Sequence, residues 1–271
     1  MLQLLRASHI QPVIAVTTIA TALAVAAHQG LAAATLGGAV AAGQLSVGWS
    51  NDYLDRERDR QTGRLDKPIV AGSVTARSVR RCAIAAAVLC IPLSLLLGWR
   101  AGALHLGAVA VAMGYNLGLK STIWSPLPYV LSFGSLPAVV TLQAAGHPLP
   151  PWWAVTGAAL LGCGAHFINT LADTEGDRVT NVRGLPQRLG PRSSLWIGVC
   201  LLALSAVTLA IGPAGRPQGT DALLLIAACS AALGVAAAQR ADKPRLAWSL
   251  TLTTALLVVT MLILNGRSLV V

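Results

Sequence analysis

The residues in this chain best suited to chemistry are carboxylates that recur in two similar motifs. The first motif reads Asn51-Asp52-Tyr-Leu-Asp55-Arg-Glu-Arg-Asp59-Arg60, and the second reads Asn169-Thr-Leu-Ala-Asp173-Thr-Glu-Gly-Asp177-Arg178. Both follow the pattern Asn-x₃-Asp-x₃-Asp-Arg. Side chains four residues apart lie one turn apart on the same face of a helix. Each motif therefore predicts one amide and two carboxylates aligned along a helix face.

Aligned carboxylates repel one another unless a cation lies between them. Two carboxylates about 6 Å apart repel by roughly 3 kcal/mol at an effective dielectric constant of about 20. Ligand sets made of oxygen favour Mg²⁺ over zinc, and Mg²⁺ keeps coordination positions that substrate phosphates complete. We therefore predict a Mg²⁺ site that holds a diphosphate, where the metal takes up charge that develops on the departing group.

The residues expected at this site are metal ligands and basic residues. The expected metal ligands are Asn51, Asp52, Asp55, Asp59, Asn169, Asp173 and Asp177, and the aspartates among them are the expected catalytic residues. The basic residues expected to bind the diphosphate are Arg64, Lys67, Lys120, Arg178 and Arg183. The alternative is that the acids pair with neighbouring arginines in a solvated loop. The repeated motif and its attachment to apolar segments favour the metal site.

The elements that must position these motifs are apolar segments of helical length. Hydrophobic residues make up 55% of the chain and charged residues 11%, whereas a soluble domain carries about 25% charged residues. Segments of about 20 residues suit a hydrocarbon core about 30 Å thick. We predict nine membrane spans, at residues 11–28, 31–50, 78–98, 101–118, 128–145, 152–172, 193–212, 221–238 and 247–265.

The distribution of charge predicts the orientation of these spans. With the N-terminus in the cytoplasm, the inner segments contain all of the 20 Lys and Arg residues except Arg100, Arg216 and Arg267, as the positive-inside rule requires. Both acidic motifs then lie on the cytoplasmic side. No linker divides the chain, so we expect one domain over residues 1–271. The expected location is a bacterial-type plasma membrane, with the N-terminus and the active site in the cytoplasm.

Other features argue against nucleic-acid binding and structural zinc. The net charge is +10, but the basic residues occupy short segments between apolar runs and form no continuous basic face. The five cysteines lie singly in or beside apolar segments. We therefore expect neither a nucleic-acid partner nor a disulfide framework.

Polar residues within the spans are candidates for a cavity or an acceptor site. Gln44 lies seven residues before Asn51, and His166 lies three residues before Asn169, so each shares a helix face with a motif. Polar residues within a span usually face the interior of the bundle. The candidates are Gln44, Tyr115, Asn116 and His166. The alternatives are an internally hydrogen-bonded histidine for His166 and a residue at the membrane interface for Tyr115.

With these motifs, the chain resembles the UbiA superfamily of intramembrane prenyltransferases. The matching residues are Asn51-Asp52-x₂-Asp55-x₃-Asp59 and Asp173-x₃-Asp177, with Arg64-Leu-Asp-Lys67-Pro68-Ile-Val-Ala-Gly72 and Gly184-Leu-Pro-Gln-Arg-Leu-Gly190. The resemblance covers nearly the whole chain. One departure is at Asn116, because many members have a tyrosine at the position four residues before the lysine that corresponds to Lys120.

The resemblance implies an all-α bundle of about nine transmembrane helices around a central cavity, with cytoplasmic cap helices in the two Asp-rich loops. It also implies that an isoprenoid diphosphate binds to the aspartates through Mg²⁺. Ionisation of the diphosphate would produce an allylic cation, which requires dry, apolar surroundings. The isoprenoid tail would extend between the spans toward lipid. An unidentified acceptor would then attack the cation.

Two other functions are consistent with parts of the sequence. In a terpene cyclase of the same superfamily, double bonds of the isoprenoid itself attack the cation. The acidic motifs are the same in both enzymes, because both reactions begin with ionisation of the diphosphate. In a divalent-cation transporter, the acids would lie near the bilayer midplane, whereas these lie at the ends of spans. The sequence specifies neither the acceptor nor the prenyl chain length, and it leaves the oligomeric state open.

Overall fold

The protein is helical throughout its regular structure. The computed structural model describes residues 2–172, 177, 182–213 and 219–270, and it contains no strand within these ranges. The helices are α1 (Leu2–Ala7), α2 (Ile10–Ala26), α3 (Ala32–Gln61), α4 (Ala76–Leu95), α5 (Trp99–Leu117), η1 (Leu119–Ser121), α6 (Leu127–Gln143), α7 (Trp152–Ala172), α9 (Leu185–Leu189), α10 (Pro191–Ile211), α11 (Gly219–Arg240), α12 (Pro244–Leu264) and η2 (Gly266–Leu269).

Each predicted span overlaps one long helix, and the largest difference is in α3. This helix continues to Gln61, although the predicted span ends at residue 50. Hydropathy shows where apolar residues end, but the Arg and Glu residues that follow are good helix formers. Arg58 and Arg60 also lie in the last turn, where basic side chains interact favourably with the helix dipole. The first acidic motif therefore lies on α3 itself and not in a loop.

The composition of the helices is that of a membrane protein. Five of the described helices, α4, α7, α10, α11 and α12, are long and apolar enough to cross a membrane, and α2 and α6 are shorter apolar helices. Large apolar side chains face outward, including Val88, Leu223 and Leu256, which are 63%, 69% and 68% exposed. Such surfaces suit lipid better than water. The chain is therefore an all-α membrane protein, while the count of nine spans stays a prediction.

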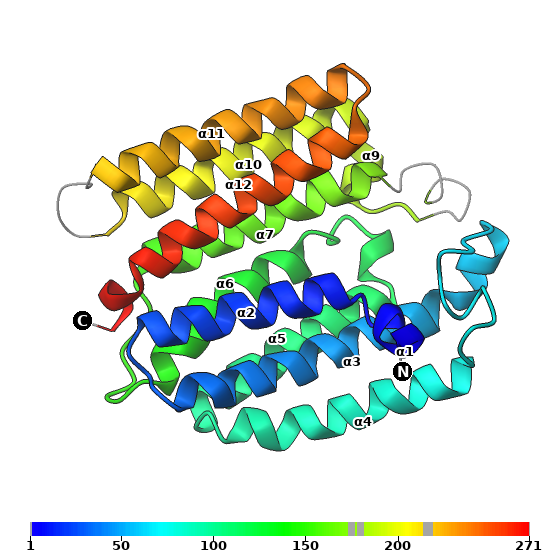
Figure 1. The fold of residues 1–271 in the computed structure, drawn as a ribbon, viewed down its shortest axis with the longest axis horizontal. Coiled ribbons are helices and arrows are strands. Elements are labelled where there is room, and N and C mark those ends of the chain that lie inside the picture. Colours follow the sequence, from blue (N-terminus) through cyan, green and yellow to red (C-terminus); the bar gives the residue numbers. More distant parts are fainter. Residues whose placement is uncertain (1, 173–176, 178–181, 214–218, 271) are drawn as a thin grey trace.

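The long helices lie side by side in one bundle (Figure 1). Helices that follow one another along the chain pack together, chiefly α2 with α3, α3 with α4, α6 with α7, α7 with α10, and α11 with α12. Both α12 and η2 also contact α2. The last helices therefore return to the first, and the bundle closes on itself.

Glycines allow several helices to approach closely. A Cβ atom added to Gly157 would lie 2.6 Å from Leu209, and one added to Gly198 would lie 2.6 Å from Ile168, so both glycines bring α7 and α10 together. Close packing at small residues is common in membrane bundles. A Cβ atom on Gly48 would lie 2.0 Å from the carbonyl oxygen of Ser8. Gly48 therefore holds α3 against the N-terminal segment just before the acidic motif.

Several segments meet at the end of the bundle where α3 ends. Figure 1 shows α1, the loop after α3 and α9 at this end. The second acidic loop contains the short helix α9 as an expected cap. The first loop, residues 62–75, consists of turns and bends instead of a regular helix. Gly63 and Gly72 adopt positive φ values of 67° and 70°, which interrupt helical structure.

Replacing Gly48 with alanine is expected to lower the melting temperature of the purified protein by about 5 °C, because an overpacked contact costs about 1–3 kcal/mol. Gly38→Ala is the matched control on the same helix, since the nearest atom to its added Cβ is 4.0 Å away, on Leu93. We expect no loss of stability in this control. Equal melting temperatures for the two variants would contradict the close approach of Ser8 to α3.

Candidate active site

Three aspartates of the first motif are buried near the end of α3. Asp52, Asp55 and Asp59 are 2%, 7% and 3% exposed. Their spacing places them on one helix face, as the sequence predicted. A buried carboxylate is unfavourable unless cations or hydrogen-bond donors surround it. The surrounding elements must therefore bring positive charge to this end of the bundle.

Two lysines provide part of this charge. Lys67 Nζ donates a hydrogen bond to Asp52 Oδ1 over 3.0 Å, and Lys120 Nζ donates to Asp55 Oδ1. Lys67 lies in the turns after α3, and Lys120 lies in η1. Lys67 Nζ also lies 3.0 Å from His9 Nε2, at the start of α2. Both lysines were predicted to bind a diphosphate, and the structure places them beside the predicted metal ligands.

Arg58 contacts the buried carboxylates, although the sequence did not distinguish it from the other arginines of the motif. Its guanidinium donates to Asp55 Oδ2 over 3.1 Å. It also lies 3.9 Å from Asp59 Oδ1 and 4.0 Å from Asp177 Oδ1. Arg58 therefore connects the first acidic motif to the last aspartate of the second.

The second motif reaches this cluster through Asp177. Gln187 Nε2, on α9, donates to Asp177 Oδ2 over 2.7 Å, so α9 positions this carboxylate. Asn169 lies half-buried near the end of α7. Asp173 and Arg178 lie outside the described residues. The contacts of Asp177 nevertheless place the end of the second motif beside the first.

A pair of asparagines fixes the first motif against α5. Asn51 Nδ2 donates to Asp55 Oδ2 over 3.2 Å and to Asn116 Oδ1 over 3.0 Å. Asn116 Nδ2 in turn donates to the carbonyl of Val47 over 2.9 Å. Asn116, a predicted cavity residue, therefore orients Asn51 and links α5 to α3.

Two of the predicted diphosphate-binding arginines lie on the surface. Arg64 Nε donates to Asp66 Oδ1 over 2.9 Å, and both side chains are exposed. Arg183 is also exposed, and its carbonyl accepts a hydrogen bond from Arg188 Nε over 2.7 Å. Diphosphate binding by Arg64 or Arg183 stays a prediction.

Tyr115, Tyr129 and His166 form an aromatic cluster among α5, α6 and α7. The His166 ring centroid lies 4.6 Å from that of Tyr129 and 5.9 Å from that of Tyr115. His166 Nε2 lies 3.1 Å from Ser125 Oγ, which accepts a hydrogen bond from the amide of Leu185 at the start of α9. His166 is therefore hydrogen-bonded within the bundle, and contact of Tyr115 or His166 with an acceptor stays a prediction.

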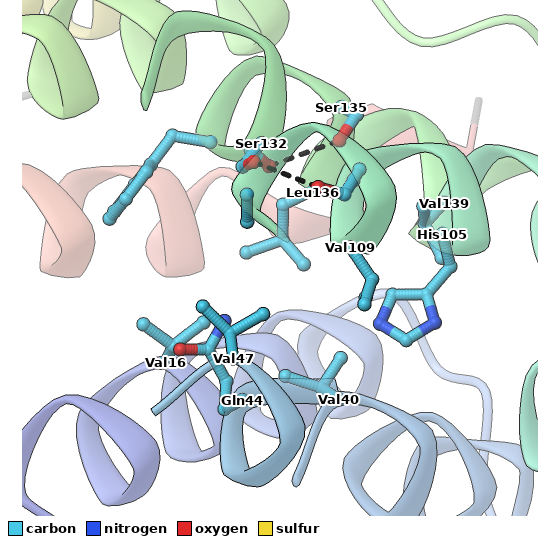
Figure 2. Close-up of a pocket in the computed structure, with 13 residues that line it drawn as sticks. Val16, Val40, Gln44, Val47, His105, Val109, Ser132, Ser135, Leu136 and Val139 are labelled. Atoms are coloured by element: carbon cyan, nitrogen blue, oxygen red, sulfur yellow. Dashed lines mark hydrogen bonds between the residues drawn. The ribbon is translucent and has the colours of Figure 1, made fainter. Parts of the chain in front are cut away.

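Gln44 lies apart from the acidic cluster, in the wall of a cavity of about 60 Å³ between α2, α3, α5 and α6 (Figure 2). This position agrees with the prediction that Gln44 faces the interior. Because Gln44 precedes Asn51 by seven residues, about 10 Å of helix separates the two positions. The cavity therefore lies deeper in the bundle than the acidic motif.

Burial shifts the pKa values of the charged groups around the motif. Burial raises the pKa of the Asp59 carboxyl, while the positive charges of Lys67 and Arg58 oppose this shift. Burial also lowers the pKa of Lys120, while its contact with Asp55 opposes the shift. At both groups the neighbours of opposite sign counteract part of the effect of burial on the pKa.

The donors at this site are compatible with Mg²⁺. The predicted ligands supply carboxylate and amide oxygens, which Mg²⁺ prefers. Asp52 Oδ2 is buried and has no hydrogen-bond partner among the described residues. The described ranges contain no group of three His, Cys, Asp or Glu side chains that could hold a metal, but Asp173 and Glu175 lie outside them. The identity of the complete ligand set therefore stays a prediction.

Comparison with known proteins identifies the family. The model of the UbiA prenyltransferase family matches residues 13–260. The chain belongs to this family. It is 32% identical over 184 residues to the bacteriochlorophyll synthase 33 kDa chain of Cereibacter sphaeroides. The aligned region covers 63% of this chain and 59% of that protein. It is 27% identical over 150 residues to digeranylgeranylglyceryl phosphate synthase of Pyrococcus horikoshii. This aligned region covers 53% of this chain and 52% of that protein. The match therefore spans little more than half the length of these UbiA relatives.

Solved structures of UbiA homologues have the same fold. The apo structure of a homologue from Aeropyrum pernix K1 has a TM-score of 0.75 and 20% identity, and the match covers 94% of this chain and 98% of that one. The structure of a homologue from Archaeoglobus fulgidus bound to GPP and Mg²⁺ has a TM-score of 0.71 and 17% identity, with 99% of each chain covered. These similarities confirm the predicted UbiA-like membrane fold.

Replacing Arg58 with leucine is expected to lower the melting temperature in EDTA by about 5 °C or more, because the loss of one member of a buried ionic cluster leaves uncompensated charge. Added Mg²⁺ should restore part of the loss by supplying positive charge. Arg60→Leu is the matched control, because Arg60 pairs with Glu57 at the surface and exposed pairs contribute about 0–1 kcal/mol. Equal melting temperatures for the two variants would contradict the proposed bridging role of Arg58.

Proposed function

We propose that this chain is a Mg²⁺-dependent intramembrane prenyltransferase that ionises an isoprenoid diphosphate and transfers the prenyl group to an acceptor. The observation that carries this proposal is the meeting of the two acidic motifs, in which Arg58 contacts both Asp55 and Asp177. Buried carboxylates and lysines at the end of an apolar bundle suit a substrate with a charged head and a hydrocarbon tail.

Relatives support the class of substrate. The Archaeoglobus fulgidus homologue has been solved with DMAPP and Mg²⁺ and with GPP and Mg²⁺. Both organic ligands are prenyl diphosphates. The curated relatives are named for different products, bacteriochlorophyll and digeranylgeranylglyceryl phosphate. The relatives therefore favour a prenyl diphosphate as the donor but do not select an acceptor.

The side chains of the acidic cluster have separate roles in this proposal. The residues that would hold Mg²⁺ are Asn51, Asp52, Asp55, Asp59, Asn169, Asp173 and Asp177. The bound ion supplies positive charge that stabilises the departing diphosphate. Lys67 and Lys120 would exchange their contacts with Asp52 and Asp55 for contacts with phosphate oxygens. This exchange would release the carboxylates for the cation while keeping the lysines charged and paired.

The bundle would protect the reactive intermediate from water. An allylic cation survives only where water is excluded, and the apolar side chains of the helices would provide this environment. We also propose that the N-terminus and the acidic cluster face the cytoplasm of a bacterial-type plasma membrane, since the basic residues concentrate in the segments on that side. The substrate head would then enter from the cytoplasm, and its tail would extend toward lipid.

Replacing Asp55 with asparagine is expected to reduce turnover of geranylgeranyl diphosphate at least about 100-fold, because an amide of similar size cannot match the charge of a carboxylate at the cation. The assay uses purified protein, Mg²⁺ and extracted membrane lipids as a source of acceptors. Glu57→Gln is the matched control on the same helix: Glu57 pairs with Arg60 at the surface, so turnover should stay within about twofold of wild type. Normal turnover in folded Asp55→Asn protein would contradict the assignment.

The products distinguish transfer from cyclisation. We expect a prenylated acceptor when wild-type protein receives both the diphosphate and the lipid extract, and no such product from Asp55→Asn. Incubation with farnesyl or geranylgeranyl diphosphate alone is the second arm. A hydrocarbon or terpene alcohol formed there by wild-type protein, and absent from Asp55→Asn, would identify a cyclase instead.

A further inference from the structure

His9 joins α1 to α2 in a backbone conformation that is uncommon for a residue other than glycine. Its φ and ψ values are both 56°, in the left-handed region. A residue stays in this region only where surrounding contacts hold it there, and such residues concentrate at functional sites. The contacts around His9 therefore indicate what this segment positions.

The segment before His9 is held against α3 by contacts that do not involve the imidazole. Trp49 Nε1 donates a hydrogen bond to the carbonyl of Leu4 over 2.7 Å. Ser8 is fully buried, and its carbonyl packs directly against Gly48. These contacts come from the turn of α3 that precedes the first acidic motif, so they place His9 beside that motif.

The imidazole of His9 accepts a hydrogen bond from Lys67. Lys67 Nζ lies 3.0 Å from His9 Nε2 and 3.0 Å from Asp52 Oδ1. An ammonium group has three hydrogens and no lone pair, so Nε2 must be the acceptor in this contact. Nε2 is 3.9 Å from Asp52 Oδ1, beyond hydrogen-bond range. His9 and Asp52 therefore each take one hydrogen of Lys67, and a third hydrogen remains.

The two partners of Lys67 differ in charge. Burial lowers the pKa of the His9 imidazole and the positive charge of Lys67 lowers it further, while Asp52 and Asp55 oppose the shift. A neutral imidazole leaves the charge of the lysine intact, whereas the carboxylate of Asp52 offsets it. Mg²⁺ prefers oxygen ligands, so it would draw Asp52 away from Lys67 but would leave His9 in place.

We propose that His9 is a positioning residue, which keeps the ammonium of Lys67 directed at the diphosphate while Asp52 binds the cation. This inference rests on the proposed function and adds a role for the N-terminal segment in substrate binding. An unpaired lysine side chain has many rotamers, and ordering it on binding lowers the affinity. With His9 as a fixed partner, Lys67 stays ordered after it releases Asp52, and its remaining hydrogens bond to phosphate oxygens.

The alternative is that His9 only docks the N-terminal segment on α3. The two roles differ in what they require of the side chain. Docking is already provided by Leu4 and Ser8, and it is independent of Lys67. Positioning needs an acceptor atom at the reach of Nε2, and it has no effect when the lysine is absent.

Calorimetric titration of the purified protein with geranyl thiolodiphosphate in the presence of Mg²⁺ tests this proposal. His9→Phe keeps a ring but removes the acceptor, so we expect about tenfold weaker binding, the effect of one hydrogen bond to a charged group. His9→Gln places an amide oxygen at about the reach of Nε2 and should restore most of the affinity. His28→Phe is the matched control and should bind as the wild type does, because His28 is exposed and has a positive φ of 59° just after the other end of α2.

A comparison with Lys67→Ala separates positioning from docking. We expect His9→Phe to weaken binding when Lys67 is present but to have no further effect when it is alanine, because the two residues act through one contact. Equal weakening in both backgrounds would overturn the proposal. Wild-type affinity in folded His9→Phe protein would overturn it as well.

His9→Asn keeps the test decisive if the phenylalanine variant does not fold. Asparagine suits the left-handed conformation, but its shorter side chain does not reach Lys67, so binding should again be about tenfold weaker. Wild-type affinity in this variant would contradict the proposal. A wild-type protein that does not bind the analogue would contradict the proposed function too, whereas binding that no substitution of His9 alters would contradict only the role of His9.

Discussion

The burial of three carboxylates at the end of α3 is the constraint on which the rest of the structure depends. Ionised carboxylates are unstable in an apolar bundle unless positive charges lie close to them. These charges come from three places: Lys67 in the turns after α3, Lys120 in η1, and Arg58 on α3 itself. The loop that follows α3 must therefore pack around the end of this helix, and so must η1. The side chain of Arg58 must also turn toward Asp177.

Under the proposed function, this balance of charge would let the site receive a diphosphate without a large change of fold. The lysines that neutralise the carboxylates are the groups that phosphate oxygens would attract, and a divalent cation would take their place beside the acids. Only the charged partners of the lysines and of the carboxylates would change, while the helices keep their positions. Deeper along α3, the wall beside Gln44 is neutral, and its polar groups differ in kind from those of the acidic cluster. The helix α3 thus presents charged groups at its end and the neutral amide of Gln44 inside the bundle.

The sequence predicted the long helices and the shared face of Asp52, Asp55 and Asp59, because hydropathy and helical spacing are local properties. The predicted span ended at residue 50, since hydropathy reports preference for lipid and not helix formation, whereas the four-residue spacing of the motif predicted the helical continuation that α3 shows. The role of Arg58 depends on packing against a residue more than 100 positions away, so no local pattern could separate it from its neighbours.

The central claim is that aspartates of both motifs hold one diphosphate together through Mg²⁺. Calorimetric titration with geranyl thiolodiphosphate, an analogue that ionises slowly, measures this most directly in wild-type protein, Asp55→Asn, Asp177→Asn and the double variant. We predict that binding requires Mg²⁺ and that the double variant loses less binding free energy than the sum of the two single losses, because both aspartates act on one ion. Equal affinity in Mg²⁺ and in EDTA, or strictly additive losses, would contradict this claim.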